Sequence, residues 1–254
     1  MSRPSIAELR TVAQPDATMM RRNGEHWAGR LYMRRASVHV TRVLVGTRVT
    51  PNQLTGLMIV AGVAAGAAVL VPTVAGPLLA ALLVQAYLLL DCVDGEVARW
   101  TGRTSVTGVY LDRVGHYLAE AALLVGVGFR AAALEPNGWA VLGLVAALCA
   151  VLVKAETDLV DVARAKNGLP AVADVAAMPR SARVASMRRF ASAVRLHRIT
   201  GAIEASLLVL VAGVVDQLRG GLTAMRVVVA LLAVVAAVMV VLHLASILAS
   251  RRLS

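Results

Sequence analysis

Acidic and aromatic residues are scarce in this chain of 254 residues, which has 15 Asp and Glu in total, three Trp, four Tyr and two Phe. Its two cysteines, Cys92 and Cys149, both lie in apolar segments and are too few for a zinc cluster, so we expect neither a disulfide nor a cysteine-based metal site. The first 45 residues are polar and rich in arginine and lack the short apolar core of a signal peptide. These absences exclude the small disulfide-rich secreted proteins and the zinc-finger proteins.

Apolar residues, by contrast, are abundant. They make up 58% of the chain, whose mean hydropathy is +0.72, and Ala, Val and Leu occur in long blocks. A typical soluble domain is only about 45–50% apolar. Several of the blocks reach the roughly 20 residues that a helix needs to cross a bilayer. The composition therefore predicts an all-α integral membrane protein.

The apolar blocks define six predicted transmembrane helices, at residues 53–71, 77–100, 106–130, 138–164, 199–217 and 223–249. Short interruptions such as EPNG and DQLRGG contain the Pro and Gly that are typical of turns. We therefore expect two parts, a cytoplasmic N-terminal region over residues 1–48 and a six-helix transmembrane domain over residues 49–254. A polar linker over about 165–198 interrupts this domain and is expected to form short interfacial helices.

The formal charge of +11 comes almost wholly from arginine. A strongly basic protein can bind nucleic acid, but here the basic residues lie between apolar segments, so we expect membrane lipids and not nucleic acid as partners. One side of the membrane would hold the nine arginines of the N-terminal region and seven Lys and Arg of the linker. Because positive charge accumulates on the cytoplasmic side, we predict a cell inner membrane protein with both termini in the cytoplasm.

The N-terminal region divides into two stretches. Residues 1–23 are expected to form a poorly ordered tail. Residues 24–46 alternate apolar and basic residues at helical spacing, which predicts an amphipathic helix lying on the cytoplasmic leaflet. An ordinary juxtamembrane segment without function is the alternative. The first span then follows TPNQLT, where Thr50 can cap a helix and Pro51 suits its first turn.

Carboxylates cluster in DCVDGEVARWTGRTSVTGVYLDRVGH, residues 91–116, directly after the apolar run QAYLLL. Asp91 and Asp94 are three residues apart and share one face of the second predicted helix. Gly108, Asp112 and His116 are each four residues apart and form a stripe along the third. A short turn makes the two helices antiparallel neighbours, so these faces can converge near the cytoplasmic side.

Such carboxylates are costly, at about 2.5–3.5 kcal/mol each near a bilayer centre. Arg99 and Arg113 could offset part of this cost, and a divalent cation would offset more, because clustered carboxylates are the ligands that magnesium prefers. The alternative is a buried network of acids and arginines that only fixes helix packing. The small residues Gly95, Ala98 and Gly108 leave room for a ligand or allow close helix packing, and their positions alone do not distinguish the two.

The segment from Asp91 to Asp112 resembles the signature of the CDP-alcohol phosphotransferases, also called CDP-alcohol phosphatidyltransferases. That signature reads D-x-x-D-G-x-x-A-R, eight residues, then G-x-x-x-D-x-x-x-D. Every fixed position matches except the last, where this chain has His116. A weaker similarity extends to TPNQLT, to the basic segment after the fourth span and to the six-span layout.

The resemblance implies a membrane enzyme, usually dimeric, that cleaves the pyrophosphate of a CDP-linked donor. CMP leaves, and an alcohol attacks the other phosphorus to form a phosphodiester. Asp91, Asp94 and Asp112 would hold a divalent metal, Mg²⁺ or alternatively Mn²⁺, with Asp112 also in a catalytic role. The residues implied to bind the donor are Asn52, Gly95, Ala98, Arg99 and Gly108.

The chain departs from this signature at residue 116, where it has His in place of Asp. In the family this final Asp is a metal ligand, the general base, or both. Three interpretations stay open. The imidazole could serve as the base, since its ordinary pKa near 6.5 suits neutral pH. The site could hold one metal, since imidazole is a poor magnesium ligand and suits manganese or zinc better. The protein could also bind its substrate without turnover. The alternative to all three is a core histidine that only packs, with its hydrogen bond satisfied.

Basic residues near the cytoplasmic end of the fourth and fifth spans are candidates for binding the acceptor. Lys154 lies in an otherwise apolar stretch, and Asp158, one helical turn further on, is its expected partner. Lys154, together with Arg195 and Arg198, would form a basic rim that suits a phosphorylated acceptor such as a polyol phosphate. The alternative for these residues is the general excess of positive charge on the cytoplasmic side.

The sequence thus predicts a phospholipid-synthesising transferase with CDP-diacylglycerol as donor and an alcohol or polyol phosphate as acceptor. A CDP-linked polar alcohol as donor and a lipid as acceptor is the alternative within the family. A membrane prenyltransferase also holds magnesium pyrophosphate through acidic motifs, but it normally has two such motifs and more spans. A nucleotide- or lipid-binding protein without turnover is the non-enzyme alternative, and only His116 favours it.

Overall fold

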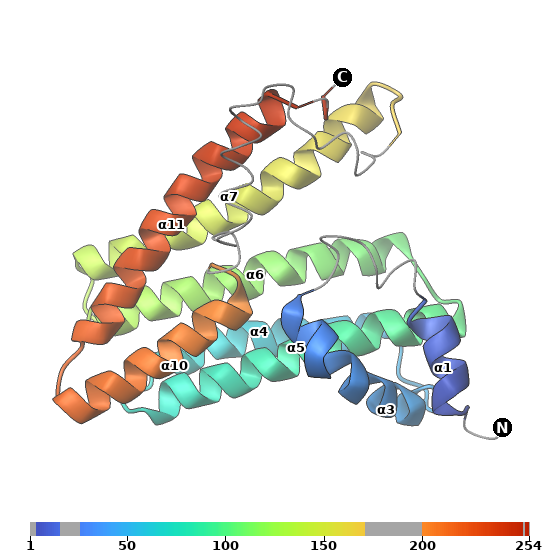
Figure 1. The fold of residues 1–254 in the computed structure, drawn as a ribbon, viewed down its shortest axis with the longest axis horizontal. Coiled ribbons are helices and arrows are strands. Elements are labelled where there is room, and N and C mark those ends of the chain that lie inside the picture. Colours follow the sequence, from blue (N-terminus) through green and yellow to red (C-terminus); the bar gives the residue numbers. More distant parts are fainter. Residues whose placement is uncertain (1–3, 16–25, 171–199, 251, 254) are drawn as a thin grey trace. The chain divides into compact units, whose positions relative to one another are not determined.

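The computed structural model of the protein describes residues 4–15, 26–170, 200–250 and 252–253, and these residues contain helices and no strand (Figure 1). The all-α prediction is therefore confirmed for the described part of the chain. In chain order the helices are α1 (Ile6–Ala13), the π-helical η1 (Gly29–Met33), α3 (Arg34–Leu44), α4 (Pro51–Val69), α5 (Ala75–Thr101), α6 (Val106–Ala131), α7 (Gly138–Lys166), α10 (Ala202–Arg219) and α11 (Thr223–Leu248).

Each predicted span coincides with one of the long helices, namely α4, α5, α6, α7, α10 and α11. Four of them, α4, α5, α7 and α11, are long and apolar enough to cross a membrane, which makes this an integral membrane protein. Helices α6 and α10 are not among these four, and they carry charged residues such as Glu120 and Glu204. Six spans therefore stay a prediction.

The helices group into two compact units. The first unit contains residues 1–64 and 82–119, and the second contains residues 65–81 and 120–254. Helices α4, α5 and α6 contribute residues to both units.

Local signals in the sequence explain where the helices of the first unit begin and end. Thr50 and Gln53 form a reciprocal cap at the start of α4, as expected, with Thr50 N–H donating to Gln53 Oε1 over 2.9 Å. Helix α5 ends at Thr101, and the next residue, Gly102, has a φ of +66°, which few other residues adopt. Three residues later the Ser105 hydroxyl accepts the Gly108 N–H over 3.0 Å and caps α6. The two halves of the acidic segment are therefore helices joined by a short turn.

The prediction of a poorly ordered N-terminal tail was wrong for residues 6–13, which form α1. Ser5 Oγ accepts the Glu8 N–H over 3.2 Å, and Glu8 Oε2 accepts the Ser5 N–H over 2.7 Å. The second of these bonds holds the pKa of the Glu8 carboxyl below its usual range. This Ser-x-x-Glu box is legible in the sequence and predicts a helix start. Residues 16–23 of the expected tail lie outside the described residues.

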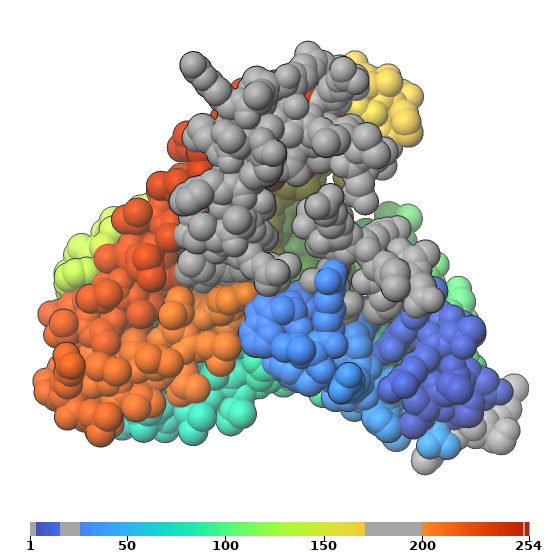
Figure 2. Space-filling view, in the orientation of Figure 1, coloured from blue at the N-terminus to red at the C-terminus, as the bar shows by residue number. Residues whose placement is uncertain are grey.

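The predicted amphipathic segment over 24–46 is helical over η1 and α3. One face of α3 is buried through Ser37, Val38 and Thr41, while Arg35 and His39 are exposed. Figure 2 shows α1 and α3, in two shades of blue, side by side on the surface. Contact with a membrane surface stays a prediction.

An apolar cluster of Leu54, Val93 and Val97 joins α4 to α5 in the first unit, and Val40 and Leu44 of α3 pack against it. In the second unit, α6 and α7 approach closely at two glycines. A Cβ added to Gly128 would lie 2.6 Å from Gly143 Cα, and one added to Gly143 would lie 2.5 Å from Gly128 Cα. Backbone atoms occupy the space of both missing side chains, so these glycines serve helix packing.

This close approach predicts that Gly128→Ala destabilises the protein by about 1–3 kcal/mol, because the helices must separate to admit the methyl group. The measurement is denaturant-induced unfolding in detergent micelles. Gly138→Ala is the matched control, since a Cβ at that position meets nothing within 4 Å. Equal stability of the two variants would contradict the close approach.

Candidate active site

The acidic segment forms one wall of a cavity of about 320 Å³ in the first unit. The start of α4, the C-terminal part of α5, the following turn and the start of α6 supply most of its lining. The lining residues are Arg34, Pro51, Asn52, Thr55, Asp91, Asp94, Gly95, Ala98, Arg99, Arg103, Thr104, Ser105, Gly108, Val109 and Asp112. All the residues that the family resemblance assigns to the metal and the donor are thus brought to one cavity.

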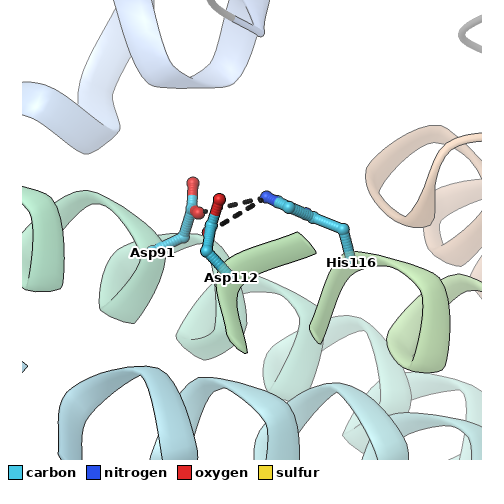
Figure 3. A group of neighbouring side chains, drawn as sticks. All are labelled: Asp91, Asp112 and His116. Atoms are coloured by element: carbon cyan, nitrogen blue, oxygen red, sulfur yellow. Dashed lines mark ion pairs between the residues drawn. The ribbon is translucent and has the colours of Figure 1, made fainter. Parts of the chain in front are cut away.

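Beside this cavity, two carboxylates and one imidazole converge from two helices. Asp91 comes from α5, whereas Asp112 and His116 come from successive turns of α6, and the three side chains point toward one another (Figure 3). His116 Nε2 lies 3.4 Å from Asp91 Oδ1 and 3.5 Å from Asp112 Oδ1. The spacing of four residues on α6 produces this geometry, because such residues lie one above the other on a helix face.

The other nitrogen of His116 is also engaged. Its Nδ1 contacts the hydroxyl of Tyr87, and the two rings meet edge to face with centroids 5.7 Å apart. Tyr87 is a buried residue of α5, one turn before Asp91. Tyr87 was not part of the predicted site, although its position four residues before Asp91 on the same helix face could have indicated it.

Asp94 has a different environment. It is buried, and its Oδ2 accepts a hydrogen bond from Thr55 Oγ1 of α4 over 2.6 Å. Asp94 therefore lines the same cavity as Asp91 and Asp112 but does not belong to the group that converges on His116.

The two glycines of the motif make room for polar side chains. A Cβ at Gly95 would lie 3.0 Å from Nη1 of Arg99, and a Cβ at Gly108 would lie 3.1 Å from Oδ1 of Asn52. Arg99 in turn donates from Nε to the carbonyl of Ala13, over 2.6 Å, at the end of α1. A cation at a helix C-terminus is favourable, so the motif arginine also anchors α1.

The predicted acceptor residues are placed only in part. Lys154 of α7 forms a salt bridge with Glu120 of α6, with 2.9 Å between Nζ and Oε1, inside the second unit. The partner that the structure shows is thus a carboxylate of the neighbouring helix and not the expected Asp158. Arg195 and Arg198 lie outside the described residues.

The donor set of Asp91, Asp112 and His116 fits a divalent cation. One ligand atom from each residue lies within 4.8 Å of the others. Carboxylate oxygens suit magnesium, and the imidazole extends the choice toward manganese.

Comparison with known proteins finds one matching family model and several similar proteins. The model of the CDP-alcohol phosphatidyltransferase family matches residues 48–252. The bifunctional IPC transferase and DIPP synthase of Thermococcus kodakarensis is 31% identical over 141 residues, which are 56% of this chain and 31% of that protein. The phosphatidylinositol phosphate synthase of Corynebacterium glutamicum is 33% identical over 84 residues, which are 33% of this chain and 37% of that protein. The chain thus spans about a third of the length of these relatives.

A solved structure shares the fold. The crystal structure of Mycobacterium tuberculosis phosphatidylinositol phosphate synthase PgsA1 with CDP-DAG bound matches with a TM-score of 0.59 and 19% identity. The match covers 85% of this chain and 95% of that chain.

The contact between Thr55 and Asp94 predicts that Thr55→Val destabilises the protein by about 1–3 kcal/mol, because a buried carboxylate oxygen loses its donor without a change in shape. Thr55→Ser, which keeps the hydroxyl, should recover part of this loss. Thr107→Val at an exposed position of α6 is the control. Thermal unfolding in detergent measures the effect, and a Thr55→Val variant as stable as the control would contradict the hydrogen bond.

Proposed function

Because this chain belongs to the CDP-alcohol phosphatidyltransferase family, we propose that it cleaves CDP-diacylglycerol, releases CMP and transfers the phosphatidyl group to an alcohol or polyol phosphate. The observation that carries this proposal is the cavity itself, which gathers the motif residues of α5 and α6 with Asn52 of α4. The choice of donor is supported by the CDP-DAG bound to the M. tuberculosis protein of the same fold. The product would be a phospholipid.

We assign the divalent cation to Asp91, Asp94 and Asp112, which line the cavity together, and not to His116, which is also near Asp91 and Asp112 but is kept here for the role of base. When bound there, Mg²⁺ or Mn²⁺ supplies charge neutralisation for the pyrophosphate and the leaving CMP. Gly95, Ala98 and Gly108 leave space for the cytidine and the phosphates. Arg99 contributes positive charge at the same wall.

His116 takes the role of base in this proposal. The acceptor hydroxyl oxygen attacks the phosphorus that carries the diacylglycerol, the bond from this phosphorus to the bridging oxygen breaks, and CMP leaves with the electron pair. The hydroxyl proton goes to His116 Nε2. Asp91 and Asp112, at 3.4 and 3.5 Å, stabilise the imidazolium that results. Nε2 can accept a proton only when Nδ1 carries one, so Nδ1–H then donates to the Tyr87 oxygen.

The placement in the membrane completes the proposal. The six long helices cross the bilayer, η1 and α3 lie on the cytoplasmic leaflet, and both termini and the cavity face the cytoplasm. The arginine-rich N-terminal region and linker support this orientation. The active form is a homodimer, as the family resemblance implies, and Lys154, Arg195 and Arg198 bind a phosphorylated acceptor.

The function is tested by incubating purified protein in detergent with CDP-diacylglycerol and a panel of alcohols and polyol phosphates, with Mg²⁺ or Mn²⁺. We expect CMP release that depends on one acceptor and stops with EDTA, because the pyrophosphate then lacks its charge neutralisation. Asp91→Asn is the control for background hydrolysis. CMP release only in a parallel assay, with a CDP-linked polar alcohol as donor and a lipid as acceptor, would favour the reverse assignment of donor and acceptor. No CMP under any condition would overturn the proposed function.

The role of His116 predicts that His116→Ala lowers kcat by about 10²–10⁴-fold, the usual contribution of a general base. His116→Asp should restore part of the activity, because it recreates the family's final motif position. Added imidazole should rescue His116→Ala but not Asp112→Ala. An Ala variant with wild-type kcat would exclude His116 as the base.

A further inference from the structure

Glu96 lies inside the motif, at a position where the family signature allows any residue, and it is not among the residues that line the cavity. Its side chain is fully buried, with 0% exposure. Four side chains of the N-terminal region donate to it. Oε1 accepts from Gln14 Nε2 at 2.8 Å, Arg34 Nη1 at 3.3 Å and Ser37 Oγ at 2.5 Å, and Oε2 accepts from Thr41 Oγ1 at 2.7 Å.

These contacts fix the rotation of α3 about its own axis. Arg34, Ser37 and Thr41 are spaced three and four residues apart and therefore lie on one helix face. A single carboxylate of α5 contacts all three. Gln14, just after α1, adds a further constraint, because its Nε2 also donates to the carbonyl of Arg34 over 2.9 Å.

Arg34 connects this buried network to the cavity. Among the described residues that line the cavity, it alone comes from the helices before α4. Its side chain is 21% exposed, so it reaches Glu96 while still bordering the open space.

The negative charge of the carboxylates in the cavity makes a positively charged side chain there important for binding an anionic donor. Asp91, Asp94 and Asp112 line it and would repel the negative pyrophosphate of a CDP-linked donor. A guanidinium offers several N–H groups in a planar fork that matches phosphate oxygens. Arg34 therefore offers such an anion a guanidinium group, and it comes from a helix outside the motif.

We propose that Arg34 binds the pyrophosphate of the donor and that Glu96 is the positioning residue that aims it into the cavity. The inference rests on the proposed function, which it extends by one binding and one positioning residue. Buried ion pairs contribute little net stability compared with apolar groups of similar shape. The benefit of a buried carboxylate at residue 96 is then orientation, since it holds one arginine in one direction.

The first test is the dependence of CMP release on the concentration of CDP-diacylglycerol at saturating acceptor. Arg34→Ala should raise KM for the donor by roughly 10-fold to 100-fold, the usual effect of losing a charge-assisted hydrogen bond. The change in kcat should be smaller, and Arg34→Lys should restore part of the affinity. Arg35→Ala removes the same charge from the exposed side of the same helix and should leave KM unchanged. Equal KM values for Arg34→Ala and Arg35→Ala would overturn the assignment.

The second test separates positioning from simple attachment of the N-terminal helices. Glu96→Gln keeps the volume but loses the charge that holds Arg34, so it should raise the same KM. If Glu96 acts through Arg34, the double variant has the KM of Arg34→Ala alone. Multiplied effects, or an unchanged KM in Glu96→Gln, would overturn the positioning role. Gln14→Leu is the second variant if Glu96→Gln does not fold, with a smaller rise in KM expected and an unchanged KM as the contrary result.

Direct binding distinguishes this inference from the proposed function. Calorimetric titration with CDP, in the presence of Mg²⁺, measures affinity without turnover. Wild-type protein that binds CDP but releases no CMP would refute the transfer reaction, whereas a loss of affinity in Arg34→Ala would still support the assigned residue. Equal CDP affinity of wild type and Arg34→Ala, or no binding by either, would refute the inference.

Discussion

Each carboxylate that α5 and α6 carry into an apolar helix bundle loses hydration, and protein donors or a cation must replace it. The replacement differs from one acid to the next. Glu96 receives four side-chain donors from the N-terminal region, and Asp94 receives the hydroxyl of Thr55. Asp91 and Asp112 face His116 and the cavity. Glu96 lies outside the cavity lining and is satisfied by protein donors, whereas Asp91, Asp94 and Asp112 line the cavity, where an ion or a substrate can complete their interactions.

This division explains why the N-terminal helices belong to the candidate site. Helix α1 is attached by Arg99 through the Ala13 carbonyl, and α3 is attached by Glu96. Both attachments use residues of the motif segment. The same nine residues from Asp91 to Arg99 therefore both line the cavity and anchor the N-terminal region, and Arg99 does both. A substitution in this segment is expected to affect the cavity and the attachment of the N-terminal helices together.

The glycines have two different roles, close packing of helices and space beside the cavity. Gly128 and Gly143 let two helix backbones approach in the second unit, where any Cβ would meet backbone atoms. Gly95 and Gly108 instead leave space beside Arg99 and Asn52 at the cavity. Composition cannot separate these uses, because both need only the absence of a side chain.

The positions of the six long helices followed from the sequence alone, because apolar length, caps and turn residues act locally. Pro51 at the start of α4 and Gly102 just after α5 mark such boundaries. The stripe of Asp112 and His116 likewise follows from helix periodicity. The partners of polar groups did not follow, since they join residues far apart in the chain. Tyr87 with His116, Thr55 with Asp94, Glu120 with Lys154 and Arg34 with Glu96 all depend on how separate helices pack. Local interactions determine where a helix lies in the sequence, but only tertiary packing decides which buried charge meets which donor.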